Sequence, residues 1–237
     1  MSSFLKLPNQ LISKTGIKMI VYGGAGTGKT RNCAITSPKP VLVAVENGLL
    51  SIQNEQIPIV DCRGENCLQN FESFVQWAKS AEAKQFDTII IDSWSELATQ
   101  LLRVEIPKAK DGRQAYGIMA DKMMNWAYQL VNQIPHNVIF ICKQECGSNN
   151  GQPYHQPSLE GKKLYTEFTH LIDVILRFQS KRFVINGKSQ EYMVASTKNQ
   201  PDYIARDRSG KLFDDEPQDI GAIINKIRGI APQQPQS

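Results

Sequence analysis

The segment from residue 23 to residue 30 limits what this chain can fold into more than any other part of its sequence. It reads GGAGTGKT and fits the pattern G-x-x-x-x-G-K-[ST] at every position. A β-rich run, residues 17–22, precedes it, and a helix that should end before Ser37-Pro38 follows it. This order of strand, loop and helix is the setting that the motif requires. The motif therefore indicates a phosphate-binding loop rather than a glycine-rich turn that matches by chance.

The loop predicts how a nucleotide would be held. Its glycines let backbone N–H groups curl around phosphates, and the start of the following helix adds its positive dipole end. Lys29 would reach the β- and γ-phosphates, and the Thr30 hydroxyl would bind Mg²⁺. The predicted nucleotide ligands are Gly23, Gly24, Ala25, Gly26, Thr27, Gly28, Lys29, Thr30 and Arg31.

Apolar patterns along the rest of the chain predict an α/β fold. Further strands are expected at residues 41–45, 87–91 and 138–142, and helices near residues 68–78, 94–106 and 118–132. Near-continuous apolar strands between helices are typical of a sheet that is parallel in its core and flanked by helices. Residues 182–195 predict a C-terminal β-hairpin around Asn186-Gly187, and Asp219 should cap a last helix that ends near Arg228.

Length and composition predict one domain. The chain has 237 residues, 41% of them hydrophobic, which is enough for one sizeable core. We expect this domain at residues 17–228, after a short lead at residues 1–16 and before a disordered Pro/Gln-rich tail at residues 229–237. Two polar stretches, residues 107–117 and 144–161, are expected to be loops, and the length of the second suggests a function.

Charge, hydropathy and cysteine spacing exclude several classes of function. The net charge of +4 is far below the dense positive surface of a protein that coats nucleic acid, so a polyanion would meet only local basic patches. The chain has no apolar signal core at its start and no apolar run long enough to span a membrane. We therefore expect it in the cytoplasm, without a membrane partner. Its five cysteines lack the spacing of a zinc site, which favours reduced thiols.

Two carboxylates are expected beside the phosphate loop. Asp92 ends an apolar strand, and ligands of open α/β sheets gather at the carboxyl ends of strands, so Asp92 should hold Mg²⁺ together with Thr30. Asp92 or Ser93 could also cap the next helix. Because Ser93 and not a glutamate follows Asp92, a base for hydrolysis must come from elsewhere. Glu46, just after the strand at residues 41–45, could activate water, although an exposed strand-end carboxylate would look the same.

The identity of the nucleotide follows from a motif that is incomplete. Guanine-specific proteins carry an [NT]-K-x-D element, and Thr197-Lys198-Asn199-Gln200 lacks its aspartate. GTP is therefore disfavoured. The predicted cofactors are ATP and Mg²⁺.

Together these residues resemble the RecA recombinase fold, and most closely the small phage RecA-like ATPases that act as single-strand annealing proteins. The resemblance extends from about residue 17 to residue 228 and implies a RecA-like P-loop core. Strands of this family end in a catalytic glutamate and in a glutamine that senses the γ-phosphate. Glu46 and Gln144 match these positions, so the implied catalytic residues are Glu46, Lys29 and Gln144. Lys143 stands where the family has an asparagine.

The resemblance also implies two single-stranded-DNA loops, one in each polar stretch. In the family the first loop precedes a Met-rich helix, to which residues 117–124 are similar. The DNA candidates are Lys108, Lys110, Arg113, Tyr116, Gln152, Tyr154, His155, Lys162 and Lys163. A solvated or packing role remains an equal alternative for each of them. A further basic cluster flanks the hairpin or widens the DNA track: Arg177, Lys181, Arg182 and Lys188.

ATP sites of RecA-like proteins lie between subunits, which implies a filament or ring of this chain. The candidates for a basic residue that acts on the neighbour's ATP are Lys198, Arg206 and Arg208, with a solvated hairpin edge as the alternative.

The predicted function is ATP-dependent binding of single-stranded DNA that promotes annealing or recombination. The expected partners are the DNA, further copies of the chain and a single-strand-binding protein, in the host cytoplasm if a phage encodes it. Two alternatives stay open. One is a replication motor or helicase-loader ATPase, and the other is a nucleotide-dependent adaptor without turnover.

Overall fold

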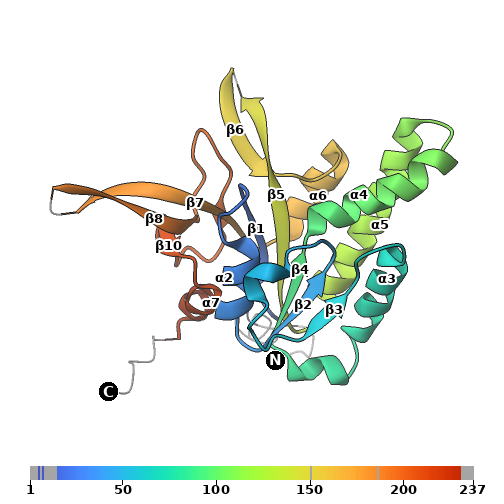
Figure 1. Cartoon of the computed structure of the whole chain (residues 1–237), viewed down its shortest axis with the longest axis horizontal. Coiled ribbons are helices and arrows are strands. Elements are labelled where there is room, and N and C mark those ends of the chain that lie inside the picture. The colour runs from blue at the N-terminus through green and yellow to red at the C-terminus, as the bar shows by residue number, and fades with distance from the viewer. Residues whose placement is uncertain (1–4, 6, 8–14, 150, 186, 231–237) are drawn as a thin grey trace.

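The computed structural model describes residues 5, 7, 15–149, 151–185 and 187–230, which form a mixed sheet with helices on both faces (Figure 1). The strands are β1 (Lys18–Gly23), β2 (Pro40–Ala44), β3 (Ile59–Asp61), β4 (Thr88–Asp92), β5 (Asn137–Asn149), β6 (Gln152–Pro157), β7 (Val174–Ile185), β8 (Lys188–Ser196), β9 (Arg206–Asp207) and β10 (Asp215–Pro217). The helices are α2 (Lys29–Thr36), α3 (Cys67–Trp77), α4 (Trp94–Glu105), α5 (Gly112–Asn132), α6 (Lys162–Leu171) and α7 (Ile220–Arg228), with short 3-10 turns η1 (Leu49–Ile52), η2 (Glu82–Gln85) and η3 (Ile106–Lys108).

The sheet is parallel at its centre. Its strand order is β10-β8-β7-β1-β5-β4-β2-β3. All pairs from β7 to β3 are parallel, whereas β8 pairs antiparallel with both β7 and β10. The structure confirms the predicted α/β class, with a mainly parallel central sheet, flanking helices and a C-terminal hairpin.

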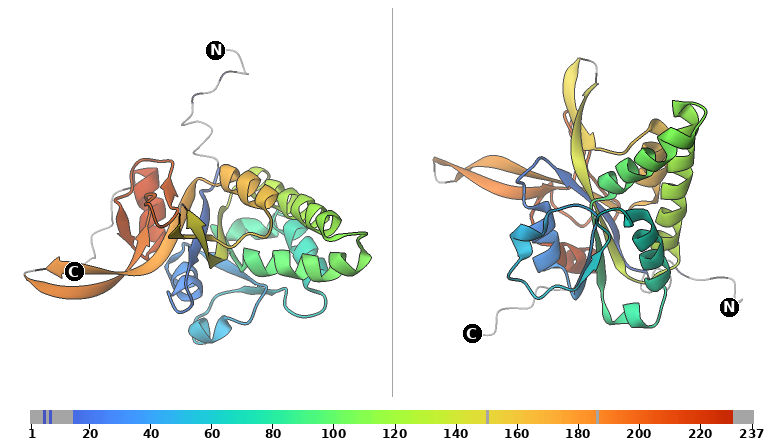
Figure 2. Two further views of the ribbon diagram at one scale, coloured as in Figure 1. Left: turned by 90° about the horizontal axis from the view of Figure 1, so that it is seen from above. Right: turned by 45° about the vertical axis from the view of Figure 1, so that its right-hand side comes forward.

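Alternation along the strands supplies two cores. In β1, Ile20 and Tyr22 face a core that includes side chains of α3, α4, α5 and α6. Met19 and Val21 face the opposite core, which includes side chains of α2 and α7. Because successive side chains of a strand point to opposite faces, a strand that is covered on both sides must be apolar throughout. Figure 2 shows these two groups of helices on opposite sides of the sheet.

Aromatic rings fill the centre of the larger core. The ring centroids of Trp94 and Phe140 lie 4.9 Å apart, and those of Trp94 and Phe168 lie 5.2 Å apart. Phe71 contacts Trp126 at 5.0 Å. These residues come from α3, α4, α5, β5 and α6, so the cluster joins four helices to the sheet.

The structure corrects both predicted loops. In the first polar stretch, α5 already begins at Gly112, where Asp111 Oδ1 accepts a hydrogen bond of 2.9 Å from the Gln114 N–H. In the second, β5 extends to Asn149 and turns back as the antiparallel strand β6. A ribbon that packs neither face on a core needs no apolar alternation, so its polar sequence looked like a loop. The helix α6, with Leu164 and Phe168 buried one turn apart, was not predicted.

Other predictions from the sequence hold. The β7–β8 hairpin is present, with Ile185 opposite Lys188; Asn186 lies outside the described residues. Asp219 caps α7, since its Oδ1 accepts a hydrogen bond of 2.9 Å from the Ala222 N–H. All five cysteines are free thiols. The proposed lead at residues 1–16 and tail at residues 229–237 fall mostly outside the described residues.

Neither a membrane span nor a metal-ligand cluster is found in the described part of the chain. None of its helices combines the length and the apolar character that a membrane crossing needs. The described residues also contain no group of three or more His, Cys, Asp or Glu side chains that could hold a metal ion by themselves.

We predict that Phe140→Ala destabilises the fold by about 3–5 kcal/mol, because it opens a cavity between Trp94 and Phe168 that the helices cannot refill. Urea denaturation of the purified chain measures this change. Tyr128→Ala on the exposed side of α5 is the control and should change the free energy of unfolding by no more than about 0.5 kcal/mol. Equal effects of the two substitutions would contradict the prediction.

Candidate functional site

Parallel pairing brings the ends of β1, β2 and β4 to one edge of the sheet, beside the middle of β5. Gly23 at the end of β1 is level with Lys143 on β5, and Asp92 at the end of β4 is level with Ile141 on β5 and with Ala44 on β2. Glu46 follows β2 by two residues. A cavity of about 530 Å³ opens at this edge, and Gly23, Lys29, Glu46, Lys143 and Gln144 are among the residues that line it.

Glycine is required in the phosphate loop. Gly26 and Gly28 have φ angles of 74° and 83°, which other residues rarely adopt. A Cβ on Gly23 would lie 2.2 Å from the Phe178 carbonyl oxygen, so β1 and β7 can pair closely only with glycine at this position. The loop conformation is therefore set by its own sequence and by the neighbouring strand.

Lys29 lies over the loop. Its Nζ donates hydrogen bonds of 2.9 Å and 2.8 Å to the carbonyl oxygens of Gly23 and Gly24. Burial lowers the pKa of Lys29, and the negative charges of Asp92 and Glu46 oppose that shift. An ammonium group at this position can neutralise phosphate oxygens bound by the loop.

Thr30 and Asp92 form the predicted metal pair. The Thr30 hydroxyl donates a hydrogen bond of 2.6 Å to Asp92 Oδ2. Burial raises the pKa of Asp92, and the hydrogen bond from Thr30 opposes the rise. Hydroxyl and carboxylate oxygens are ligands that Mg²⁺ prefers. Glycine at position 48 leaves space beside them, because a Cβ there would lie 3.6 Å from the Thr30 hydroxyl oxygen and 3.7 Å from Asp92 Oδ2. These residues therefore fit a magnesium ion bound together with phosphate oxygens.

The helix cap next to Asp92 belongs to Ser93. Ser93 Oγ accepts a hydrogen bond of 3.2 Å from the Glu96 N–H at the start of α4. Asp92 is thus not needed as the cap and keeps its carboxylate for Thr30. Of the two alternatives that the sequence left open, the structure gives the cap to Ser93.

Glu46 lies in the cavity with its carboxylate on Lys143. Lys143 Nζ is 3.2 Å from Glu46 Oε2 and 2.7 Å from Glu96 Oε2. A carboxylate at the phosphate edge can accept a proton from a water molecule that attacks a phosphate. The predicted base is therefore within the same cavity as Lys29.

Arg31 points away from this cavity. Its Nη1 donates a hydrogen bond of 3.1 Å to the Ser51 carbonyl and lies 3.9 Å from Glu55. Ser51 belongs to the wall of a second, mostly apolar cavity of about 690 Å³, to which Leu49, Leu50 and Ile52 contribute. An apolar cavity next to a phosphate loop offers space for the base of a nucleotide.

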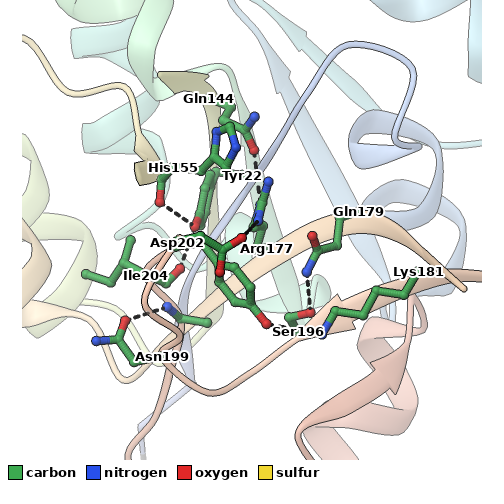
Figure 3. Close-up of polar contacts among 12 residues, drawn as sticks. Tyr22, Gln144, His155, Arg177, Gln179, Lys181, Ser196, Asn199, Asp202 and Ile204 are labelled. Atoms are coloured by element: carbon green, nitrogen blue, oxygen red, sulfur yellow. Dashed lines mark hydrogen bonds and ion pairs between the residues drawn. The ribbon is translucent and has the colours of Figure 1, made fainter. Parts of the chain in front are cut away.

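Gln144 is joined to a buried arginine. Arg177 Nε donates a hydrogen bond of 3.2 Å to Gln144 Oε1, and the guanidinium lies 4.7 Å from the centre of the Tyr203 ring (Figure 3). Arg177 is only 8% exposed, with Asp202 3.9 Å away as an ion-pair partner. From the sequence, Arg177 and Lys181 are expected in a basic cluster that flanks the hairpin or widens the DNA track. In the structure both contact other residues of the chain, and Lys181 pairs with Asp215 at 2.8 Å. Arg182 and Lys188 are exposed.

The β5–β6 hairpin is fixed at its base by the same group of residues. The Tyr22 hydroxyl donates hydrogen bonds to the carbonyl oxygens of His155 and Ile204, and the His155 N–H donates one of 2.8 Å to the Asp202 carbonyl (Figure 3). The hairpin is therefore tied to β1, which carries the phosphate loop, and to the segment after β8.

Seven of the nine DNA candidates lie on two projections beyond the edge of the sheet that carries the phosphate loop. Figure 1 shows the β5–β6 hairpin and the tip between α4 and α5 extending past the strand ends. Lys108, Lys110, Arg113 and Tyr116 are exposed at that tip. Gln152 is exposed on β6, whereas Tyr154 and His155 are half-buried. The remaining two candidates, at the start of α6, are Lys162, which is exposed, and Lys163, which pairs with Asp121 at 2.7 Å.

The candidates for action in trans make contacts inside this chain. Lys198 forms an exposed ion pair with Asp214. Arg206 Nη2 donates to the carbonyl oxygens of Thr169 and Ile172, and Arg208 Nη2 donates to that of His170 at 2.7 Å, so both arginines bind the carboxyl end of α6. A role of any of the three in a neighbouring site stays a prediction.

Two residues of the site were missed by sequence reasoning. Tyr22 is the only residue of β1 whose side chain ends in a hydroxyl, which is a weak signal for a buried hydrogen bond. Glu96 completes the pattern Ser93-Trp94-Ser95-Glu96, which is typical of a helix start, but its carboxylate binds Lys143. Only the folded chain reveals that second contact.

Comparison with protein families identifies the family of this chain. A family model described as an AAA domain, AAA_24, matches residues 15–209. The chain belongs to this AAA domain family. A solved KaiC-like protein from the hyperthermophilic archaeon Pyrococcus horikoshii OT3 is similar in structure, with a TM-score of 0.40 and 14% sequence identity over 76% of this chain and 78% of that chain. No curated protein matches the sequence.

The family and the site are consistent with each other. The chain contains an AAA domain, and its phosphate loop, threonine and aspartate are arranged to bind a nucleotide with Mg²⁺.

We predict that Lys29→Ala weakens binding of ATP with Mg²⁺ by about 10- to 100-fold, because it removes charge-assisted hydrogen bonds to phosphate. Titration with a fluorescent ATP analogue measures the affinity. The exposed Lys84, outside the residues that line this cavity, supplies the control Lys84→Ala, for which no change is expected. Wild-type affinity in Lys29→Ala would contradict the assignment of the loop.

Proposed function

We propose that this AAA domain is an ATP-dependent single-stranded-DNA-binding ATPase that promotes annealing or recombination of DNA strands. The observation that carries the proposal is the continuity of β5. Its residues 143 and 144 line the ATP cavity, and its later residues form the exposed hairpin with β6. A conformational change of β5 at the ATP cavity can therefore be passed along the strand to the exposed β5–β6 hairpin.

The chemistry of the projections suits single-stranded DNA. The hairpin offers a polar ribbon with a half-buried tyrosine, Tyr154, and the nearby helix starts bring exposed basic side chains. The starts of α5 and α6 lie together, since a Cβ on Gly161 would be 3.5 Å from Tyr116 Cδ1. Single-strand binders combine basic side chains that follow the phosphate backbone with aromatic rings that stack on bases. The modest net charge fits binding by such local patches.

The contacts of Gln144 support coupling between ATP and DNA. Gln144 borders the ATP cavity and accepts the hydrogen bond from Arg177, which also contacts Tyr203 and faces Asp202. Because a buried guanidinium is costly without partners, movement of Gln144 toward a γ-phosphate would disturb the segment that holds the hairpin. ATP and DNA would then both act on one equilibrium between two positions of Gln144, one on Arg177 and one toward the γ-phosphate.

Within the proposal, ATP and Mg²⁺ are the cofactors and further copies of the chain are partners in a filament or ring. A single-strand-binding protein is a further proposed partner, and the proposed place of action is the cytoplasm, that of the host if a phage encodes the chain. The exposed Lys198 and its pairing with Asp214 support a contact between copies, because a surface ion pair exchanges partners at little cost.

We predict that single-stranded DNA binds the chain, raises its rate of ATP hydrolysis, and binds more weakly as salt rises, with a log–log slope of about −0.7 for each phosphate contact.

Glu46→Gln should lower kcat by about 10²- to 10⁴-fold through loss of the base. Fluorescence anisotropy of a labelled oligonucleotide and phosphate release measure the two effects. The double variant Lys110→Gln/Arg113→Gln should weaken DNA binding and Lys84→Gln should not. Tight ATP binding with no turnover in the presence of DNA would instead support a nucleotide-dependent adaptor.

We predict that Arg177→Gln and Tyr22→Phe each reduce the effect of ATP on DNA affinity and, by reciprocity, the effect of DNA on ATP affinity. Each variant removes one hydrogen-bonded link at the base of the hairpin. Arg228→Gln is the control, since Arg228 bonds to Asn137 at the start of β5, the far end of that strand from the ATP cavity. Both affinities are measured by titration with and without the other ligand. Full coupling in both variants would exclude this route.

A further inference from the structure

Glu46 has one ion-pair partner in the part of the chain that the structure describes, and this partner is Lys143. Lys143 Nζ lies 3.2 Å from Glu46 Oε2, with the Lys143 side chain 48% exposed and the Glu46 side chain 32% exposed. Asp92 lies close enough for its charge to act on Glu46 unfavourably. Without Lys143, the Glu46 carboxylate would therefore have no partner that fixes its direction.

Lys143 is itself anchored on the other side. Its Nζ lies 2.7 Å from Glu96 Oε2. Glu96 is 14% exposed at the start of α4, and its Oε1 accepts a hydrogen bond of 2.9 Å from Gln100 Nε2. Arg103 adds a second positive charge 3.9 Å from the same oxygen. Glu96 is thus held within its own helix, so it can serve as a fixed point for the lysine.

The backbone of Lys143 is fixed as well. Its N–H donates a hydrogen bond of 3.0 Å to Ser95 Oγ, and its carbonyl accepts one of 2.8 Å from the Ser158 N–H. Ser95 Oγ also donates a hydrogen bond of 2.6 Å to the Ser158 carbonyl. These contacts set the point from which the Lys143 side chain starts. The ion pair with Glu96 then directs the Lys143 side chain toward Glu46.

The charges agree with an ionised pair of Lys143 and Glu96. Burial lowers the pKa of Lys143, but the hydrogen bonds and negative charges of Glu96 and Glu46 raise it more. Burial raises the pKa of Glu96, but the hydrogen bond and charge of Lys143 lower it more. The pair Lys143 and Glu96 therefore stays charged at neutral pH.

We propose that Lys143 is a positioning residue for ATP hydrolysis, which is anchored on Glu96 and directs the Glu46 carboxylate at the phosphate edge. The inference rests on the proposed function, in which Glu46 is the base. In that reaction a water oxygen attacks the γ-phosphorus and the bond from this phosphorus to the ADP oxygen breaks. Glu46 accepts the water proton and later returns it to solvent, so the products are ADP and phosphate. Lys143 acts through Glu46 and does not take part in bond formation.

A direct role on phosphate is the competing explanation. Lys143 lines the same cavity as Lys29, and an ammonium group there could bind the γ-phosphate itself. The two roles differ in what is lost on substitution. Loss of a phosphate ligand weakens ATP binding, whereas loss of a positioning residue lowers kcat and leaves ATP affinity unchanged.

The test compares Lys143→Gln, Lys143→Arg, Glu96→Gln and Glu46→Gln with the wild type in kcat and in the equilibrium affinity for ATP with Mg²⁺. We expect Lys143→Gln and Glu96→Gln to lower kcat by about 10-fold or more and to change the affinity by less than about twofold. Lys143→Arg should recover most of the rate, because arginine keeps the charge and reaches both carboxylates. Thermal denaturation identifies any variant that fails to fold. Lys143→Gln, at a partly exposed residue, and Glu96→Gln remove the same ion pair from its two sides, so they test the positioning role independently.

The double variant Glu46→Gln/Lys143→Gln decides whether the lysine acts through the glutamate. If it does, the double variant is as slow as Glu46→Gln alone, to within about twofold. Additive losses would overturn the inference, and so would a normal kcat in Lys143→Gln or a loss of ATP affinity in place of kcat. Normal turnover in Glu46→Gln is a different result: it would remove Glu46 as the base and with it the catalytic part of the proposed function.

Discussion

The close parallel pairing of β1 with β5 on one side and β7 on the other is the constraint on which the rest of the structure depends. It leaves no space for a side chain at Gly23, where a Cβ would meet the Phe178 carbonyl oxygen at 2.2 Å. It also aligns Gly23 with Lys143. Since β4 pairs with the other side of β5, Asp92 arrives at the same edge. The phosphate loop and its acidic partners thus share one edge because of strand register.

Contacts between carboxylates and ammonium groups govern the chemistry at that edge. Three carboxylates, those of Glu46, Asp92 and Glu96, face two ammonium groups, those of Lys29 and Lys143. Each carboxylate has a different fixed contact: Asp92 binds the Thr30 hydroxyl, Glu96 binds Gln100, and Glu46 depends on Lys143. A partly buried site with several like charges is stable only when each charge is paired, which explains why these residues hold one another in place.

The hairpin of β5 and β6 extends the site into solvent. A two-stranded ribbon satisfies its backbone hydrogen bonds between its own strands, so it can carry a polar sequence far from the core. Its base is fixed by Tyr22 and by contacts to residues 202–204. The base is also linked through Gln144 and Arg177 to the cavity beside the phosphate loop. In the proposed function, β5 thereby carries both the nucleotide site and the DNA-binding surface.

The sequence by itself determined the local features: the phosphate loop, the buried strand that ends in Asp92, the hairpin turn and the Asp219 cap. Each depends on residues that are neighbours in the chain, so spacing and residue type were sufficient. Tertiary structure alone decided the strand order, the extension of β5, and the pairing of Lys143 with Glu46 and Glu96. It also placed Arg177 inside the fold. The side-chain contacts of Lys143 and Arg177 join residues about 30 to 100 positions apart, and no local pattern encodes which side chains packing will bring together.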